Sequence, residues 1–251
     1  MIRFNEAVDQ MVAASVCQFV QRTERIRDLF AGVLAHDLRS PVSAIMNSAR
    51  VILQDKNLSP ISLRAGASLQ RSAERVKVLI DDLFVFTRTR LGDRLPVDFT
   101  KQDFGRICRD AAEEVRAASP DAQIDVHVAT GLIGMWDGAR VSQLLVNLLN
   151  NAIQHGTGTV RLEVVSDDEQ VLLTVSNAGV PIPANALPTL FDPLTRGEPS
   201  RGHKRASSGI GLGLYICRCI VNAHHGTIVV ESDDEKTMFT VKMPWVQVPT
   251  H

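Results

Sequence analysis

The sequence predicts a helical region followed by an α/β sandwich. Apolar residues recur every three or four positions, with little strand signal, as far as about Arg90. Beyond residue 98, runs of β-branched residues alternate with helical stretches. With 251 residues, 45% of them hydrophobic and 22% charged, the chain is globular and long enough for two domains. We expect a helical domain over residues 1–92 and an α/β domain over residues 93–251, joined by GDRLPVD at residues 92–98.

A hairpin of two long helices is predicted for the first domain. The first helix has its apolar seam at Phe30, Leu34, Leu38, Pro41, Ile45, Ala49 and Ile52. Ser59 and Pro60 start the second helix as N-cap and first helical residue. Its apolar positions are Ile61, Leu69, Val76, Leu79, Ile80, Leu83 and Phe84. A single hairpin cannot cover such a face, so we expect two copies to form a four-helix bundle. The alternative is that the face packs on the second domain.

One histidine on the first helix is predicted to face solvent. At ~100° per residue, His36 lies roughly 200° around the helix from the seam residue Leu34. Asp37 is its neighbour, Ser40 follows one turn later on the same outward face, and Pro41 is expected to bend the helix. Such an imidazole can accept an incoming group, although taken alone it can equally be an ordinary surface histidine.

In the second domain we expect one sheet with helices on one face. Predicted helices span Asp103–Ala118, Asp137–His155 and Ile210–His224. Predicted strands span Ile124–Ala129, Leu132–Trp136, Thr159–Ser166, Val171–Ser176, Thr227–Ser232 and Met238–Met243.

Three segments of this domain suit a phosphate-bearing ligand. Asn147 and Asn151 share one helical face, and their amide oxygens suit Mg²⁺, although the spacing taken alone favours an ordinary polar stripe on an amphipathic helix. Glycines 209, 211 and 213 directly precede a helix, whose free N–H groups and dipole favour anions. A basic, glycine- and proline-rich loop before them carries Arg196, Lys204 and Arg205, which either close on phosphate or belong to an ordinary solvated loop. Asn177 ends a strand, and Gly179 follows it in a turn.

Charge and composition exclude several other classes. Lys+Arg is 27 and Asp+Glu is 28, for a net charge of −1, so a basic nucleic-acid footprint is absent. No apolar run approaches the ~18 residues of a membrane helix, and no signal peptide is recognisable. We therefore expect a cytoplasmic protein without a membrane span. The cysteines at positions 17, 108, 217 and 219 are expected to be reduced thiols, with a disulfide or zinc site as the alternative.

Together and in this order, these segments resemble the histidine kinases of two-component signalling, over roughly residues 20–245. The phospho-acceptor box of that family is matched by FAGVLAHDLRSPVSAI, the N box by NLLNNAIQHG, the G1 box by VSNAGVPIP, the F box by LFDPLTRG and the G2 box by GIGLGLYI. The segment KTMFTVKMP resembles the closing strand of that family. The resemblance implies a dimeric helical-hairpin bundle followed by a Bergerat-type ATP-binding sandwich, the fold of DNA gyrase and the mismatch-repair ATPases.

The resemblance also implies a role for each matched residue. His36 is phosphorylated by ATP, Asp37 acts as general base and Ser40 positions a water. Asn151 is the main Mg²⁺ ligand and Asn147 supports it. The phosphates lie on Gly209, Gly211 and Gly213, and Thr237 lies near adenine. Further nucleotide contacts are implied at His155, Asn177, Gly179, Ile182, Lys204, Arg205 and Leu214. The phosphoryl group then passes to an aspartate of a separate response regulator.

Four positions depart from the family pattern. Asn177 replaces the usual G1 aspartate, and with Pro181 it resembles the phytochrome-like variants; we expect ATP binding with looser discrimination against GTP. Pro181 replaces a glycine and should stiffen the turn. Ser40 stands where strong phosphatases have Thr or Asn, and His155 where many relatives have Tyr.

Two other functions stay open at this level. The G1 changes could leave a dimeric scaffold that does not bind ATP, or the chain could be a chaperone-like or anti-sigma ATPase of the same fold. The helix bearing His36 argues against the latter. Only ~35 residues precede His36, so we expect either a catalytic fragment of a longer kinase or an input that arrives through the N-terminal helix.

Overall fold

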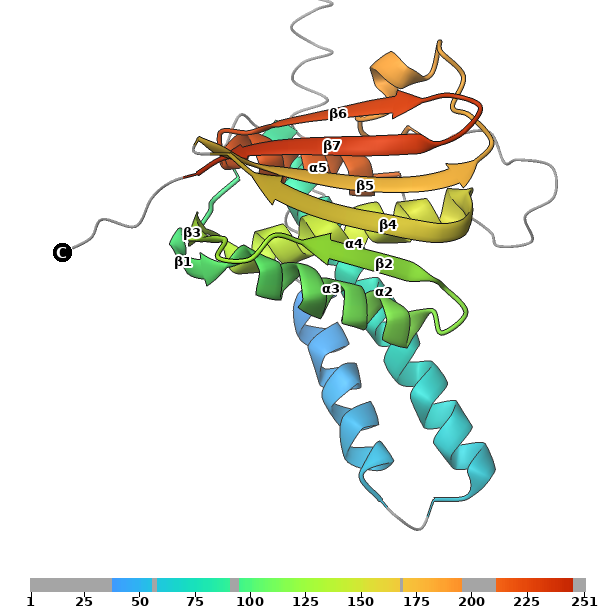
Figure 1. Cartoon of the computed structure of the whole chain (residues 1–251). Coiled ribbons are helices and arrows are strands. Elements are labelled where there is room, and N and C mark those ends of the chain that lie inside the picture. Colours follow the sequence, from blue (N-terminus) through green and yellow to red (C-terminus); the bar gives the residue numbers. More distant parts are fainter. Residues whose placement is uncertain (1–37, 56–57, 91–94, 168, 196–210, 246–251) are drawn as a thin grey trace, which may run out of the picture. The chain divides into compact units, whose positions relative to one another are not determined.

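The computed structural model describes residues 38–55, 58–90, 95–167, 169–195 and 211–245. The chain divides into two compact units, Met1–Asp93 and Arg94–His251. We describe each unit separately (Figure 1).

The first unit is a hairpin of two helices. Residues 38–53 form the described part of the first helix, and α2 spans Pro60–Arg90. Ser59 Oγ accepts a hydrogen bond from the Ser62 N–H at 3.1 Å, which confirms Ser59 as the N-cap that the sequence predicts. The two helices run antiparallel in Figure 1.

Within the hairpin, the contact face matches the predicted seam only in part: Ala49 of the first helix is buried as predicted, and so is Ile80 of α2. Val42 and Ile80 are buried, with Met46, Leu83 and Phe84 packed against them. By contrast, Leu38, Ile45 and Ile52 of the predicted seam are 47%, 44% and 47% exposed. The apolar face of this helix is therefore two adjacent stripes, and spacing alone could not tell which of them packs inside the hairpin.

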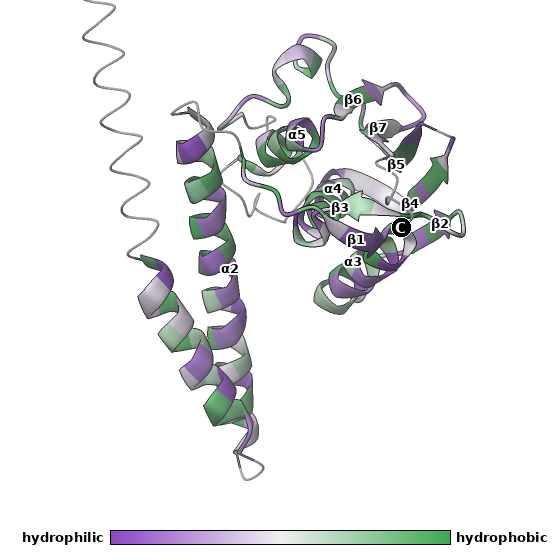
Figure 2. Ribbon diagram, turned by 90° about the vertical axis from the view of Figure 1, so that its left-hand side faces the viewer, coloured by the Kyte–Doolittle hydropathy of each residue, from purple (hydrophilic) through white to green (hydrophobic). Residues whose placement is uncertain are grey.

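An exposed apolar stripe is also present on α2, the other helix of the hairpin. Leu69 and Val76 of α2 are 45% and 43% exposed, one heptad apart, whereas Ala73 between them is buried. Hydrophobic residues alternate with hydrophilic ones along both helices of the hairpin in Figure 2. Among the exposed hydrophobic ones are Leu38, Ile45, Ile52, Leu69 and Val76. No described helix is long and apolar enough to cross a bilayer.

The second unit contains a five-stranded sheet in the order β2-β4-β5-β7-β6. Its strands are β2 (Ile124–Val128), β4 (Gly156–Ser166), β5 (Gln170–Gly179), β6 (Thr227–Ser232) and β7 (Thr237–Pro244). The β2–β4 pair is parallel and the other pairs are antiparallel. All five strands were predicted, with ends shifted by up to three residues.

One predicted strand lies in a different sheet. β3 (Ile133–Trp136) pairs with β1 (Thr100–Asp103) in a separate two-stranded sheet, so the expectation of a single sheet was wrong. β1 was not predicted because its sequence, TKQD, is polar throughout and has no alternation. A short 3₁₀ turn, η1 (Leu187–Thr189), was also not predicted.

Three helices cover one face of the large sheet: α3 (Phe104–Ala118), α4 (Gly138–His155) and α5 (Gly213–Ala223) (Figure 1). Asp103 and Asp137 cap α3 and α4 by accepting from the Arg106 and Arg140 N–H groups. The core between helices and sheet includes the fully buried Leu144, Leu145, Leu148, Leu149, Leu162 and Leu173. This layer arrangement confirms the predicted α/β sandwich.

Candidate functional site

The asparagines of α4 lie on the side of the helix that meets the start of α5. Leu144 and Leu148 of the same helix are buried in the core, and Asn147 and Asn151, which flank this buried side, are half-buried. Asn147 Nδ2 donates a hydrogen bond to the Gly213 carbonyl at 3.4 Å. The structure thus brings together the N-box face and the glycine-rich turn, 66 residues apart in sequence.

Within that turn, Gly211 and Gly213 are glycines for different reasons. Gly211 has φ +80°, and a Cβ there would lie 2.9 Å from the Thr195 carbonyl oxygen. Its own carbonyl accepts from the Leu194 N–H at 3.0 Å. Gly213 has no such restraint, since a Cβ there would come no closer than 3.8 Å to Asn147. Gly211 is therefore required by the backbone, whereas Gly213 leaves open space beside Asn147.

α5 begins without a side-chain cap. Its N-cap residue, Leu212, makes no capping hydrogen bond, and no acidic residue lies in the first turn. The expected helix Ile210–His224 therefore starts later than predicted, at Gly213, because Gly211 has a left-handed backbone. Uncapped N–H groups next to a glycine turn fit a phosphate, which is the ligand that the sequence predicts here.

A second group of predicted residues meets at the end of the sheet. Asn177 and Thr237 are direct partners on β5 and β7, and both side chains are buried. Asn177 Nδ2 donates to the Ala178 carbonyl at 3.0 Å. Gly156 pairs with Gly179 across β4 and β5, and a Cβ on Gly156 would lie only 2.5 Å from Asn177 Nδ2. Glycine at position 156 therefore makes room for the Asn177 amide.

Ser232, a residue that sequence reasoning missed, joins this second group. Its Oγ accepts from the Ile182 N–H at 2.9 Å and shares a hydrogen bond with Thr237 Oγ1 at 2.7 Å. These contacts tie the G1 turn to the β6–β7 hairpin. No pattern could have found Ser232, since a serine at a strand end is common in any sheet.

α4 connects the two groups. Asn147, Asn151 and His155 follow one another at intervals of four residues, and His155 is the last residue before Gly156. Ile182 and Leu214, two further predicted site residues of the second unit, are half-buried. His36, Asp37, Lys204, Arg205 and Gly209 were also predicted as site residues and lie outside the described residues.

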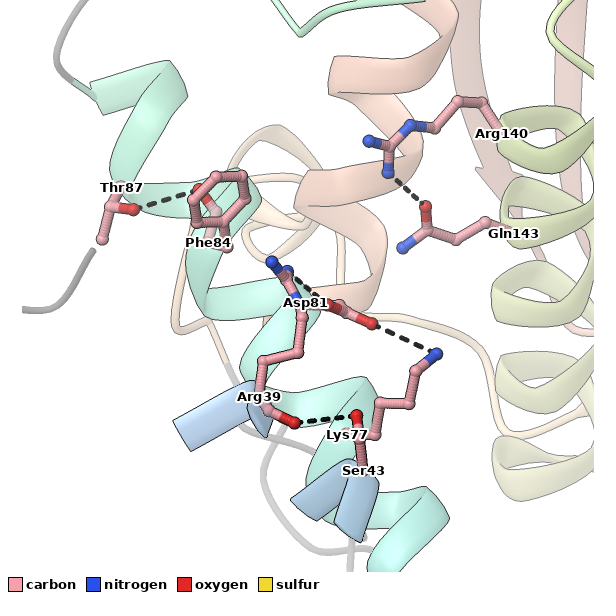
Figure 3. Close-up of polar contacts among 8 residues, drawn as sticks. All are labelled: Arg39, Ser43, Lys77, Asp81, Phe84, Thr87, Arg140 and Gln143. Atoms are coloured by element: carbon pink, nitrogen blue, oxygen red, sulfur yellow. Dashed lines mark hydrogen bonds and ion pairs between the residues drawn. The ribbon is translucent and has the colours of Figure 1, made fainter. Parts of the chain in front are cut away.

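Ser40 and a cluster of charged residues lie on the hairpin. Ser40 is exposed. Arg39 pairs with Asp81 of α2 at 2.6 Å and stacks over the Phe84 ring at 5.1 Å, and Lys77 lies 3.6 Å from the same carboxylate (Figure 3). Asp82, which follows Asp81 on α2, is buried, and its Oδ1 has no hydrogen-bond partner among the residues that the structure describes. Burial, with a contribution from Asp81, raises the pKa of Asp82 to about 7.

A groove of about 570 Å³ lies elsewhere, along β2 and α3. Arg109, Glu113 and Arg116 line it together with the whole of β2, and it contains none of the predicted site residues.

Comparison with protein families first defines the class of the second unit. Residues 136–247 match the family of histidine kinase-, DNA gyrase B- and HSP90-like ATPases. Residues 26–92 match the His Kinase A phospho-acceptor domain. The chain carries both halves in order and therefore belongs to the histidine kinases of two-component signalling, as the sequence motifs predict.

Individual relatives agree with this assignment. A probable sensor histidine kinase, TcrY of Mycobacterium tuberculosis, is 31% identical over 96% of this chain and 50% of its own length. A bacteriophytochrome of Pseudomonas aeruginosa is 29% identical over 90% of this chain and 31% of its own length. The chain thus spans between about a third and a half of the length of these relatives.

Solved structures show the same fold. Full-length ShkA in complex with AMPPNP superposes with a TM-score of 0.66 at 22% identity, over 88% of this chain and 46% of that one. The catalytic domain of the histidine kinase ThkA gives 0.52 at 26% identity, over 60% of this chain and 97% of that domain.

Proposed function

We propose that this chain is an ATP-dependent protein histidine autokinase, which phosphorylates His36 and passes the phosphoryl group to an aspartate of a response regulator. The observation that carries the proposal is the contact between Asn147 and Gly213. It places a face of oxygen ligands against an uncapped helix N-terminus, which is the combination that a metal-bound triphosphate requires.

In this proposal, ATP lies along α4. Its phosphates contact Gly209, Gly211 and Gly213 and the α5 N-terminus, and its adenine lies at the buried pair Asn177 and Thr237. Gly179 and Ile182 bound the base from the G1 turn, and His155 and Leu214 flank the nucleotide. Lys204 and Arg205 offset phosphate charge from the loop before Gly209.

The asparagines of α4 fit a magnesium ion. The amide nitrogen of Asn147 donates a hydrogen bond to the Gly213 carbonyl. Its amide oxygen takes no part in this bond and is a hard, neutral ligand of the kind that suits Mg²⁺. Asn151, one turn later, is the main ligand in this proposal. When bound, Mg²⁺ neutralises charge that develops on the phosphate oxygens during transfer.

Chemically, one ring nitrogen of His36 attacks the γ-phosphorus of ATP. The new N–P bond forms as the bond to the β–γ bridging oxygen breaks, and ADP leaves. Asp37 holds the ring and accepts the proton from the other ring nitrogen. Ser40, four residues after His36 in the sequence, would orient a water in a separate phosphatase reaction, in which that water hydrolyses the phosphorylated product and releases inorganic phosphate.

A second copy of the chain completes the hairpin in this proposal. Leu38, Ile45 and Ile52 form one exposed apolar row on the first helix, and Leu69 and Val76 form another on α2. Covering them with the same rows of another hairpin gives a four-helix bundle.

Calorimetry with a non-hydrolysable ATP analogue tests the nucleotide site. Replacing Asn151 by Ala should weaken magnesium-dependent binding by at least about tenfold, because the metal loses a ligand. Asn150→Ala is the matched control: Asn150 is exposed on the same helix, and its loss should leave binding unchanged. Equal binding by both variants would refute the assignment of the site.

A further inference from the structure

His224 has a buried ring at the C-terminal end of α5 whose two nitrogens are both engaged. Its side chain is 3% exposed. Nε2 lies 3.1 Å from the backbone nitrogen of Asp137, and Nδ1 lies 2.8 Å from the Ile220 carbonyl oxygen. The backbone N–H is a donor, so Nε2 must be the acceptor and the ring proton must reside on Nδ1. The contacts therefore require the neutral ring in one tautomer.

Asp137, the partner of His224, connects three segments. Its Oδ1 accepts from the Arg140 N–H at 3.0 Å and caps α4. Its Oδ2 accepts from the backbone N–H of Asp98 at 2.9 Å. Thus the group that starts α4 also binds the linker, 39 residues earlier.

Phe99 adds a second link between the linker and the ring. Its ring meets the His224 ring edge to face, with centroids 5.3 Å apart. Asp98 and Phe99 come directly before β1, at the point where the chain enters the ATP-binding unit. α4, on the other side of Asp137, carries Asn147 and Asn151.

We propose that His224 is a positioning residue whose neutral ring fastens the last linker residue, Asp98, and the following Phe99 to the start of α4, and whose protonation in mild acid releases them. A proton added to Nε2 would face the Asp137 N–H, so the hydrogen bond between them is lost. The linker is the only covalent connection between the hairpin and the ATP-binding unit. In this proposal, the attachment of the linker to the start of α4 therefore affects autophosphorylation, which needs both units.

The charges around the ring favour the neutral form. Burial lowers the pKa of His224 from its ordinary value, and the neighbouring His225 lowers it further; the Ile220 carbonyl and the Asp137 carboxylate act in the opposite direction but less strongly than burial. Phe99 contributes no charge. Because the native state binds fewer protons than the unfolded chain, the stability that this contact contributes is complete above the ordinary pKa and is lost as the pH falls through the lowered pKa, where the folded ring itself becomes protonated.

Hydrogen exchange of the full chain tests the proposal, with peptides that cover residues 95–100. The protection of Asp98, corrected for intrinsic rates, should be complete at about pH 7.5, above the range in which histidines titrate, and should fall by about tenfold once the pH passes below the lowered pKa of the folded His224 ring, which ring ¹⁵N NMR measures. His224→Asn should remove this protection above and below that pKa. His225→Asn is the matched control, since His225 is exposed and asparagine tolerates its φ of 59°. It should keep the wild-type protection at about pH 7.5 and, because it removes a charge that lowers the pKa of His224, lose this protection at a slightly higher pH than the wild type does. Unchanged protection in His224→Asn, or no pH effect in the wild type, would overturn the proposal.

A second measurement needs no variant and applies even if His224→Asn does not fold. Ring ¹⁵N NMR of the wild-type chain should show the Nδ1–H tautomer for His224 and a pKa below that of a free histidine. The Nε2–H tautomer, or an elevated pKa, would contradict the proposal.

Kinetics of folded His224→Asn separate positioning from a merely structural role. Autophosphorylation should slow while ATP affinity stays within about threefold, the net effect of one hydrogen bond. An equal loss of both would indicate a merely structural role. The exchange and NMR results do not depend on kinase activity.

Discussion

Arg39 and Asp81 join the two helices of the hairpin: Nε and Nη2 of the guanidinium donate to one carboxylate oxygen, at 3.1 and 2.6 Å (Figure 3). In the sequence, Arg39 lies three residues after His36, the proposed phosphorylation site. Both side chains are about one-third exposed, which limits the pair to a modest contribution.

Breaking this pair should loosen the hairpin. We expect Asp81→Asn to lower the free energy of unfolding by ~0.5–1 kcal/mol. Urea unfolding of the full chain measures this change, and a double-mutant cycle with Arg39→Met isolates the pair. Additive effects of the two substitutions would show that the pair contributes nothing.

Substitution of Asp82, the neighbour of Asp81, should change the free energy of unfolding in the opposite direction. Its pKa is raised from the ordinary 3.8 to about 7, mainly by burial, so the native state binds more protons than the unfolded chain between these values. Stability from this group is therefore greatest in acid and falls as the pH rises, with the full penalty above pH 7. Asp82→Asn should raise the free energy of unfolding at about pH 8 by ~1–3 kcal/mol and flatten its pH dependence. A loss of stability at that pH would show that the carboxylate is paired in solution.

Gly211 and Gly213 should tolerate alanine very differently. Gly211→Ala places a Cβ on a left-handed backbone against the Thr195 carbonyl, so it should destabilise the fold by ~1–3 kcal/mol and also abolish ATP binding. Gly213→Ala should leave the melting temperature nearly unchanged and weaken only nucleotide binding. Thermal unfolding and calorimetry of both variants check this, and equal melting temperatures would contradict the assigned roles.

Asn177 should bind adenine in place of the family's aspartate. We expect the wild type to bind an ATP analogue, Asn177→Ala to bind it at least about tenfold more weakly, and Asn177→Asp to retain binding with a sharper preference over a GTP analogue. Calorimetry with both analogues measures the three proteins. Binding by Asn177→Asp alone would instead support a scaffold that has lost its nucleotide.

Much of the fold was predictable because its signals are local. Ser59 before Pro60 identified the start of α2, and the β-branched runs identified every strand of the large sheet. β1 carries no such signal, and its pairing with β3 depends on a contact 30 or more residues away in sequence. The choice between two apolar stripes on the first helix likewise depends on which stripe α2 covers.

Within the site, residue types were more predictable than their connections. Asn147, Asn177, Gly211 and Thr237 stand in motifs, whereas Ser232 was found only through its hydrogen bonds to Ile182 and Thr237. Such a link between separate strands has no periodicity, so sequence spacing cannot reveal it.

Phosphorylation of the purified full chain with γ-labelled ATP and Mg²⁺ tests the central claim most directly. The wild type should become labelled on a bond that is labile in acid and stable in alkali, as a phosphohistidine is. His36→Gln should carry no label while still binding the ATP analogue. Label that persists in His36→Gln, or a wild type that binds the analogue and never becomes labelled, would contradict the account.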